Sequence, residues 1–284
     1  MADLIDGKAF AAKIRAEVKE DSDKLISQKQ VDPCLAVVLV GENPASKVYV
    51  GQKTKMAAEC NIKTKDFKLE ASTDQETLLK LIDELNNDSS VHGILVQLPL
   101  PKQIDERKVI DAIVVEKDVD GFHAINAGRL SIGGDMLKKA FIPCTPLGSL
   151  LLLKDHVEDL KGKSAVVIGR SNIVGKPMSQ LLIEESCTVT VVHSKTKEIE
   201  KVCSQADIIV AAIGRAEMID SKWLKDGAVV IDVGINRISI TKEDGSEGSK
   251  IVGDVDFDSA SEKASMITPV PGGVGPMTIA CLLR

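Results

Sequence analysis

One stretch, residues 164–177, limits the fold of this chain more than any other. An apolar, mostly β-branched run, 164–168, ends at Gly169, and after a polar turn Gly175 and Pro177 begin an amphipathic run. This order predicts a strand, a tight turn and the start of a helix. Such a turn presents backbone N–H groups and a positive helix end where phosphates bind. The spacing is G-x5-G rather than G-x-G-x-x-G, so a generic strand–turn–helix unit is the alternative.

A second apolar run supports a dinucleotide site and indicates which dinucleotide. Residues 188–192 form a predicted strand that is followed by His193-Ser194-Lys195-Thr196. In dinucleotide folds an acidic residue that binds the ribose stands about 20 residues after the turn, and here there is none. Arg170, Ser171 and Ser194 instead offer donors and positive charge to a 2′-phosphate. The pattern favours NADP; an ordinary solvated role for Arg170 is the alternative.

Composition excludes several classes of function. The chain has 284 residues, 44% hydrophobic and 27% charged, which is typical of a soluble globular protein and suffices for two domains. The net charge of −6 argues against nucleic-acid binding, because phosphate neutralisation needs a basic face. There is no apolar stretch of membrane-spanning length and no signal-peptide pattern, so we expect a cytoplasmic protein without membrane contact. The six cysteines and four histidines have no metal-ligand spacing, which predicts reduced, buried thiols and no metal.

Strands and helices alternate along both halves of the chain, which predicts parallel sheets built from βαβ units. In the first half Asn43-Pro44 should begin a helix, and Ser72 with Gln75 should form a capping box. The expected elements there are helix 7–29, strand 35–40, a helix to about residue 60, strand 62–69, a helix after Gln75, a strand to Gln97 and helix 105–113. The second half should contain a helix from Thr145, strands 208–212 and 229–233, a surface excursion at 241–250 and a shaped loop at 267–278.

Four residues of the first half form the candidate reaction site. Tyr49 and Lys53 are four residues apart and share one face of a predicted helix. Gln97 and Asp120 both follow predicted strands, at the edge where open α/β sheets bind ligands. Short-chain dehydrogenases use a Tyr/Lys pair, but theirs follows the cofactor turn, whereas this one precedes it. A solvated surface pair is the other alternative.

Together these motifs resemble the bifunctional methylenetetrahydrofolate dehydrogenase/methenyltetrahydrofolate cyclohydrolases. The resemblance runs in order from about residue 4 to residue 280. The motifs that carry it are Ser46-x-x-Tyr49-x-x-x-Lys53, Val96-Gln97-Leu98-Pro99-Leu100-Pro101, Lys117-Asp118-Val119-Asp120-Gly121-Phe122, Gly169-Arg170-Ser171-x-x-Val174-Gly175-x-Pro177 and Pro271-Gly272-Gly273-Val274-Gly275-Pro276-Met277-Thr278.

The resemblance implies two α/β domains around a cleft, the second a Rossmann-like NADP-binding domain, and a homodimer. We expect residues 1–144, with a returning segment 276–284, to bind folate and residues 145–275 to bind NADP. The sequence ends at Leu283-Arg284, where the family usually continues its last helix, and we expect this to affect only the packing of that segment. The implied activities are NADP-dependent oxidation of 5,10-methylenetetrahydrofolate and hydrolysis of the methenyl product to 10-formyltetrahydrofolate, a step in one-carbon metabolism that supplies purine biosynthesis.

The resemblance also implies residue roles. Lys53 would be the catalytic residue of hydrolysis, adjusted by Gln97, while Tyr49 would stack on the aminobenzoate ring and Asp120 would hold the pterin edge. The remaining substrate-binding residues would be Ser46, Leu98, Pro271, Gly272 and Gly273. The cofactor-binding residues would be Gly169, Arg170, Ser171, Val174, Ser194, Gly214, Ile235 and Thr278.

The chemistry of these residue types agrees with the implied reactions. Hydride transfer needs alignment of two carbons, whereas hydrolysis needs a group that takes a proton from water and gives one to the leaving nitrogen. One amine at Lys53 could serve both transfers. Two other classes of function are alternatives: a shikimate-dehydrogenase-like NADP oxidoreductase, which would not need Gln97 opposite Lys53, and a non-catalytic NADP-sensing module.

Overall fold

The computed structural model describes residues 1–241 and 246–284. It contains two compact units, which we name the N-terminal unit, Ala12–Ile142 with Leu282–Arg284, and the C-terminal unit, Met1–Ala11 with Pro143–Cys281. The division near residue 143 lies close to the expected boundary at 144, but both chain ends differ from the expectation. Residues 1–11 and most of 276–284 belong to the C-terminal unit, because Asp3–Leu4 pairs there with Met266–Ile267 and Thr278 bonds to Thr145.

Within its described residues, the N-terminal unit contains a three-stranded parallel sheet with β2 (Cys34–Val40) in the centre. β3 (Lys63–Leu69) and β4 (Gly93–Val96) flank it, each in parallel. Asn43 accepts a hydrogen bond from the Ser46 backbone N–H at 3.1 Å, which confirms the predicted start of the next helix. The helices are α1 (Gly7–Lys29, from residue 12), α2 (Pro44–Glu59), α3 (Gln75–Asn87), α4 (Glu106–Ala112), α5 (Ala124–Ile132), α6 (Gly134–Leu137) and the 3₁₀ turn η1 (Val115–Lys117).

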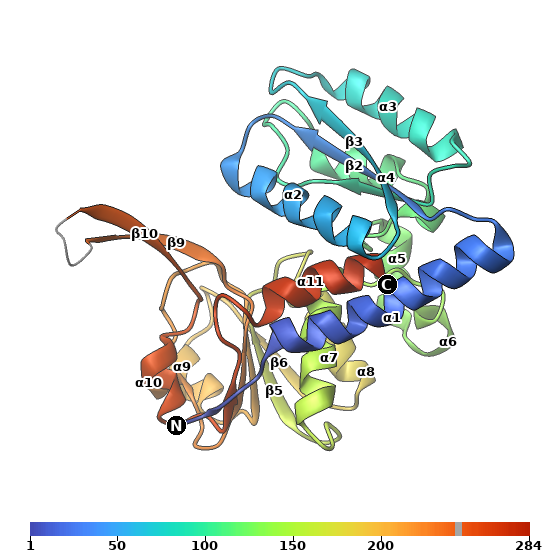
Figure 1. The fold of residues 1–284 in the computed structure, drawn as a ribbon. Coiled ribbons are helices and arrows are strands. Elements are labelled where there is room, and N and C mark those ends of the chain that lie inside the picture. The colour runs from blue at the N-terminus through green and yellow to red at the C-terminus, as the bar shows by residue number, and fades with distance from the viewer. Residues whose placement is uncertain (242–245) are drawn as a thin grey trace. The chain divides into compact units, whose positions relative to one another are not determined.

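The alternation of side chains along β2 explains how this sheet is covered. Ala36, Val38 and Val40 point to one face and form a core with Leu78 and Ile82 of α3. The intervening residues of β2 point to the opposite face and are also buried. Figure 1 shows α2 and α3 on opposite sides of this sheet. Because both faces are covered, β2 is a continuous apolar run, as the sequence predicted.

The C-terminal unit is built on a larger parallel sheet. Among the described residues its six strands follow the order β1-β11-β8-β7-β5-β6. Their bounds are β1 (Asp3–Leu4), β5 (Ser164–Ile168), β6 (Thr188–Val192), β7 (Ile208–Ala211), β8 (Val229–Asp232) and β11 (Met266–Ile267). The helices are α7 (Cys144–His156), α8 (Gly175–Glu184), α9 (Ile199–Cys203), α10 (Phe257–Ser261), α11 (Val274–Leu283) and the 3₁₀ turn η2 (Ser221–Trp223). Trp223, Cys203 and Ala260 pack against this sheet in a buried core.

An antiparallel hairpin leaves the large sheet after β8. It consists of β9 (Asn236–Thr241) and β10 (Glu247–Val252), and Figure 1 shows it extending from the rest of its unit. The sequence predicted an excursion at 241–250, of which residues 242–245 lie outside the described residues.

Two local predictions were wrong. Ser72 is not the N-cap of α3; Asp74 holds that position and accepts a hydrogen bond from the Thr77 N–H at 2.7 Å. The stretch 267–278 is not one loop, because β11 includes Ile267 and α11 begins at Val274. Pro276 fits in the first turn of α11, where backbone N–H groups have no intrahelical partner to lose.

No helix in the described part of the chain is both long enough and apolar enough to cross a lipid bilayer.

Candidate active site

Lys53 and Gln97 meet in the N-terminal unit. Lys53 lies on α2 and is only 7% exposed, and its Nζ donates to Oε1 of Gln97 at 3.2 Å. Gln97 follows β4, and its backbone N–H still pairs with Val38 at 2.9 Å. The amide of Gln97 has a fixed orientation, because Nε2 donates to the Leu98 carbonyl at 2.7 Å and leaves Oε1 for the lysine. A buried amine is therefore held by an uncharged acceptor.

Ser46 and Tyr49 share the face of α2 that carries Lys53, since helix residues three or four positions apart are neighbours. Ser46 is 4% exposed and Tyr49 is half-buried. Burial raises the pKa of the Tyr49 phenol, so this side chain stays neutral near pH 7. The neutral ring offers an aromatic face next to the amine.

Asp120 belongs to the same site. Burial raises the pKa of its carboxyl to about 6, with the charge of Lys53 lowering it and that of Asp118 raising it further. Lys53 and Asp120 therefore act on each other electrostatically, although they are far apart in sequence. At neutral pH the Asp120 carboxylate is largely ionised and is an acceptor for paired N–H donors.

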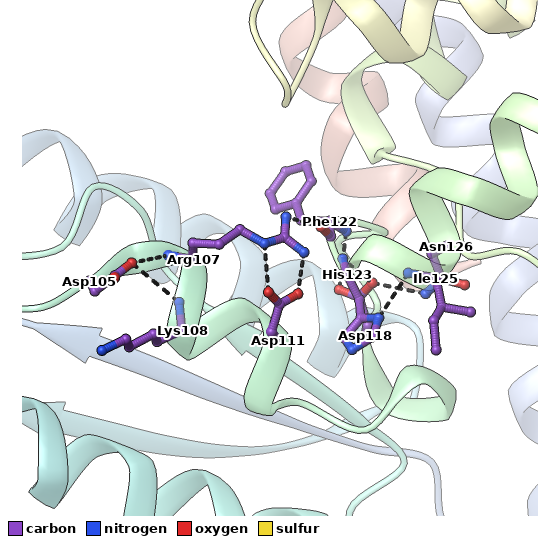
Figure 2. Close-up of polar contacts among 9 residues, drawn as sticks. All are labelled: Asp105, Arg107, Lys108, Asp111, Asp118, Phe122, His123, Ile125 and Asn126. Carbon is purple, nitrogen blue, oxygen red and sulfur yellow. Dashed lines mark hydrogen bonds and ion pairs between the residues drawn. The ribbon is translucent and has the colours of Figure 1, made fainter.

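The loop that carries Asp120 is held by a buried neighbour, Asp118, which is 1% exposed. Its carboxylate accepts hydrogen bonds from the N–H groups of Phe122 at 3.2 Å and His123 at 2.9 Å, and from Nδ2 of Asn126 at 2.8 Å (Figure 2). Burial raises the pKa of the Asp118 carboxyl, opposed by these hydrogen bonds. Three residues that follow Asp120 are thus fixed to one buried carboxylate that precedes it.

Arg107 holds the same loop from α4. Its guanidinium binds both oxygens of Asp111, and Nη1 donates to the Phe122 carbonyl at 3.2 Å (Figure 2). Asp105 caps α4 by accepting from the Arg107 N–H at 2.9 Å and the Lys108 N–H at 3.3 Å. The peptide groups of Phe122 are therefore bound on two sides, by Asp118 and by Arg107.

In the C-terminal unit, Gly169 and Gly175 shape the turn between β5 and α8. Gly169 has φ +119°, and a Cβ there would overlap the Ala212 carbonyl. A Cβ on Gly175 would overlap the backbone of Gly169. The two glycines allow the helix start to approach the strand end, which is the shape that a dinucleotide phosphate requires. The residues present therefore fit a dinucleotide cofactor.

The other predicted cofactor residues follow the strands of this sheet. Ser171 lies in the turn before α8, and its Oγ accepts from the N–H groups of Val174 at 3.1 Å and Gly175 at 3.3 Å. Arg170 and Ser194 are exposed and follow β5 and β6, which are neighbours in the sheet. Gly214 follows β7, and Ile235, 47% exposed, follows β8.

The last predicted residues lie around the start of α11. Pro271, Gly272 and Gly273 form the loop between β11 and α11. Thr278 is in α11, and its Oγ1 lies 2.9 Å from Oγ1 of Thr145 on α7. The predicted site residues thus form two groups: Ser46, Tyr49, Lys53, Gln97, Leu98 and Asp120 in the N-terminal unit, and the others in the C-terminal unit.

Two family models match the chain in the same order as these groups. The tetrahydrofolate dehydrogenase/cyclohydrolase catalytic domain matches residues 5–120, and the NAD(P)-binding domain of the same family matches residues 143–284. The chain belongs to the tetrahydrofolate dehydrogenase/cyclohydrolase family.

Relatives of this family match nearly the whole chain. The bifunctional protein FolD of Paramagnetospirillum magneticum is 60% identical over 283 residues, which cover 100% of this chain and 93% of the relative. The crystal structure of the bifunctional FolD enzyme of Campylobacter jejuni is 52% identical, with a TM-score of 0.93 and coverage of 100% and 96% of the two chains. A Trypanosoma brucei relative, solved with NADP and an inhibitor, is 38% identical, with a TM-score of 0.91 and coverage of 99% and 95%.

Membership of the tetrahydrofolate dehydrogenase/cyclohydrolase family confirms the predicted fold class and enzyme class. The protein is a bifunctional methylenetetrahydrofolate dehydrogenase and methenyltetrahydrofolate cyclohydrolase with an NAD(P)-binding domain. This decides against the two alternatives, a small-acid oxidoreductase and a non-catalytic sensor.

Sequence reasoning missed the residues that hold the Asp120 loop. Asp118 was visible in its motif but had no assigned role, and the Arg107–Asp111 pair could have been found from its four-residue spacing. The bond from Arg107 to Phe122 had no sequence signal, because it joins α4 to a loop. Lys117 was also missed: its Nζ donates to the carbonyls of Leu85, Asn86 and Asp88 at the end of α3.

The sequence predicted reduced, buried thiols and no metal. None of the six cysteines forms a disulfide within the described residues; Cys187 is half-buried and the others are buried. Within residues 1–241 and 246–284, no three His, Cys, Asp or Glu side chains gather in a way that could hold a metal ion.

Proposed function

We propose that Lys53 carries the proton in the cyclohydrolase step. Hydrolysis of the methenyl bridge adds water at the bridging carbon, and the C–N5 bond then breaks. Both protons of that water leave its oxygen: N5 gains one proton and one proton is released to solvent. One amine can make both transfers if it alternates between its neutral and charged forms. The observation that carries this assignment is the Lys53–Gln97 pair, a buried amine bound to an uncharged acceptor.

Gln97 suits this role because of the orientation of its amide. Its oxygen binds the lysine and its nitrogen is occupied by Leu98, so it positions the amine without adding a negative charge. A carboxylate in the same place would stabilise the ammonium and oppose proton release.

Tyr49 and Asp120 bind the folate in this proposal, together with Ser46 and Leu98. The neutral phenol ring of Tyr49 stacks on the aminobenzoate, and the Asp120 carboxylate accepts from the amino group and N3–H of the pterin. Burial raises the pKa of the Asp120 carboxyl to about 6, and N–H donors from the substrate would stabilise its ionised form. Pro271, Gly272 and Gly273 also contact the folate.

The C-terminal unit binds NADP, which accepts the hydride in the dehydrogenase step. Gly169, Ser171 and Val174 shape the phosphate turn, while the exposed donors Arg170 and Ser194 bind the 2′-phosphate. Gly214, Ile235 and Thr278 contact the rest of the cofactor. The rate of hydride transfer depends on the alignment of the two reacting carbons, and this step does not need a general base.

Three further expectations belong to the same proposal. The protein acts as a homodimer, works in the cytoplasm, and supplies a one-carbon unit at the formyl level to purine biosynthesis. The lack of disulfides among the described cysteines agrees with a cytoplasmic location.

One spectrophotometric experiment tests the proposed function. The purified protein is mixed with 5,10-methylenetetrahydrofolate and either NADP or NAD, and the absorbance of reduced cofactor and of methenyl product is followed. We expect turnover that prefers NADP, and faster decay of added methenyltetrahydrofolate than in buffer. Turnover without accelerated decay would contradict the cyclohydrolase assignment, and equal rates with both cofactors would contradict the role of Arg170.

A further inference from the structure

Two buried carboxylates with no assigned role lie at the carboxyl edge of the large sheet. Asp232 is the last residue of β8 and is 3% exposed, and Asp254, two residues after β10, is fully buried. Neither forms an ion pair with any described Lys, Arg or His. A buried carboxylate without a cation must be satisfied by N–H donors.

Asp254 binds the loop after β7 and the residue that begins β9. Its carboxylate accepts from three consecutive backbone N–H groups, those of Ile213 at 2.7 Å, Gly214 at 3.0 Å and Arg215 at 2.9 Å. It also accepts from Nδ2 of Asn236 at 2.9 Å. Consecutive N–H groups that converge in this way form a concave anion site, and here the anion is the protein's own side chain.

Asp232 ties the neighbouring segments to this centre. It accepts from the N–H groups of Gly234 at 2.9 Å, Asp254 at 3.0 Å and Val255 at 3.0 Å. Its own N–H donates to Oγ1 of Thr268, which follows β11, at 2.7 Å. The two carboxylates therefore join the chain segments that follow β7, β8 and β10, and the backbone N–H of Asp232 adds the segment that follows β11.

Two glycines make this arrangement possible. A Cβ on Gly234 would overlap the Asp254 carboxylate, and a Cβ on Gly253 would overlap that of Asp232. The pattern is Asp-x-Gly after β8 and Gly-Asp after β10. Because both sequences lack a side chain where the other carboxylate lies, they fit each other as a pair.

We infer that Asp254, supported by Asp232, is a positioning residue that sets the loops after β7 and β8 in their cofactor-binding shape. The inference rests on the proposed assignment of Gly214 and Ile235 to NADP. Gly214 is exposed and has φ +66°, and its N–H is bound by Asp254. Ile235 is exposed between Gly234, which Asp232 holds, and Asn236, which Asp254 holds. Gly214 and the side chain of Ile235 are thus exposed to a ligand, while the hydrogen bonds to Asp232 and Asp254 fix the backbone around them.

The test compares Asp254→Asn with Asp258→Asn, which makes the same change at an exposed position of the same unit. The isosteric amide keeps the side-chain volume, but its own N–H donors would face the backbone N–H donors of Ile213, Gly214 and Arg215. We expect the Kd and KM for NADP to rise at least about tenfold in Asp254→Asn. Hydrolysis of methenyltetrahydrofolate, measured without NADP, should keep its wild-type kcat and KM. Asp258→Asn should match the wild type in all these values.

A second pair of variants separates this inference from the proposed function. Asn236→Ala removes one donor of Asp254 but keeps the carboxylate, so it should weaken NADP binding by a smaller factor than Asp254→Asn does. This variant also tests the positioning role if Asp254→Asn fails to fold.

Ile235→Ala tests the cofactor contact itself. A loss of affinity in Ile235→Ala, with none in Asp254→Asn or Asn236→Ala, would overturn the positioning role alone. Unchanged NADP affinity in all three would overturn the assignment of these loops to the cofactor.

Discussion

Lys53 donates its hydrogen bond to the oxygen of Gln97 at 3.2 Å, and the nitrogen of that same amide is occupied by the Leu98 carbonyl. The acceptor that the lysine contacts is therefore neutral, and it cannot turn away without leaving Leu98 without its donor. If Lys53 is the proton carrier that we propose, this pairing holds it in place without adding a negative charge that would favour its charged form.

Replacing Lys53 should separate the two activities. Lys53→Met keeps the stem and removes the amine, so cyclohydrolase activity should fall by about 10²–10⁴-fold, while dehydrogenase activity falls less. The methenyl intermediate should then accumulate under NADP turnover, which its absorbance reports. Lys55→Met, on the exposed side of the same helix, is the control. If Lys53→Met hydrolyses the methenyl compound at the wild-type rate, Lys53 is not the proton carrier of the cyclohydrolase step.

Gln97→Glu should shift the pH dependence of hydrolysis. A carboxylate would hold Lys53 as an ammonium, and it would also lose the bond to Leu98. The pH at which hydrolysis reaches half of its maximal rate should therefore move upward, by about one unit or more. The measurement is kcat against pH for methenyltetrahydrofolate, corrected for the uncatalysed rate. A profile that stays in place would show that Gln97 does not adjust the amine.

Asp120→Asn should stabilise the fold at neutral pH and impair folate binding. The folded-state pKa of Asp120, about 6, lies above its unfolded value, so the folded protein holds more protons between about pH 4 and 6. The stability contributed by this group is full below that window and falls as pH rises through it. Removing the charge should therefore raise the unfolding free energy at about pH 7.5 by about 1–3 kcal/mol.

The same variant should show almost no stability gain at about pH 3, where wild-type Asp120 is mostly protonated in both states. Denaturant titrations at the two pH values measure the difference. The Kd for folate should rise while the Kd for NADP stays the same. A gain that is equal at both pH values would show that the charge of Asp120 is not its cause.

Arg170→Ala should change the choice of cofactor. Loss of one charge-assisted bond to the 2′-phosphate costs roughly 1.5–3 kcal/mol, so NADP binding should weaken far more than NAD binding. Arg170 is exposed, and the fold should be unaffected. Titration of the variant with both cofactors gives the comparison. Equal losses would mean that Arg170 does not bind the phosphate.

Asp118→Ala should destabilise the N-terminal unit. It leaves the N–H groups of Phe122 and His123 and the buried amide of Asn126 without their acceptor, at a cost of about 2–5 kcal/mol. Thermal or denaturant unfolding measures this cost, with the exposed Asp135→Ala as the control. If the loop depends on Asp118, folate affinity should fall as well. An unfolding free energy equal to that of the control would contradict the anchoring role.

The sequence predicted the sheets well because their strands are buried on both faces. Short, continuous apolar runs such as Cys34–Val40 and Ile208–Ala211 can bury all of their side chains as strands inside a sheet that is covered on both faces. Local glycines mark where these strands end. Lys53 and Gln97 could be brought together for the same reason, since Lys53 lies on the helix that follows β2 and Gln97 follows β4. Asp120 was expected just past a strand end, but it follows the 3₁₀ turn η1.

Long-range polar contacts were not predictable in the same way. Asp254 receives N–H groups from residues 39 to 41 positions earlier in the chain, and no periodicity connects them. Backbone donors leave no trace in the residue types that carry them. The helix at Val274 was missed for a different reason: Gly275 and Pro276 oppose a helix interior but are tolerated in its first turn.

The pairing of Asp3–Leu4 with Met266–Ile267 has a consequence for dividing this protein genetically. An expression fragment that begins at Pro143 would contain both family-defining glycines of the cofactor turn but would leave the β11 edge without its neighbour. Exposed strand edges recruit other chains. A shuffled or truncated gene should therefore retain the first eleven codons, joined by a linker, and a fragment without them should aggregate.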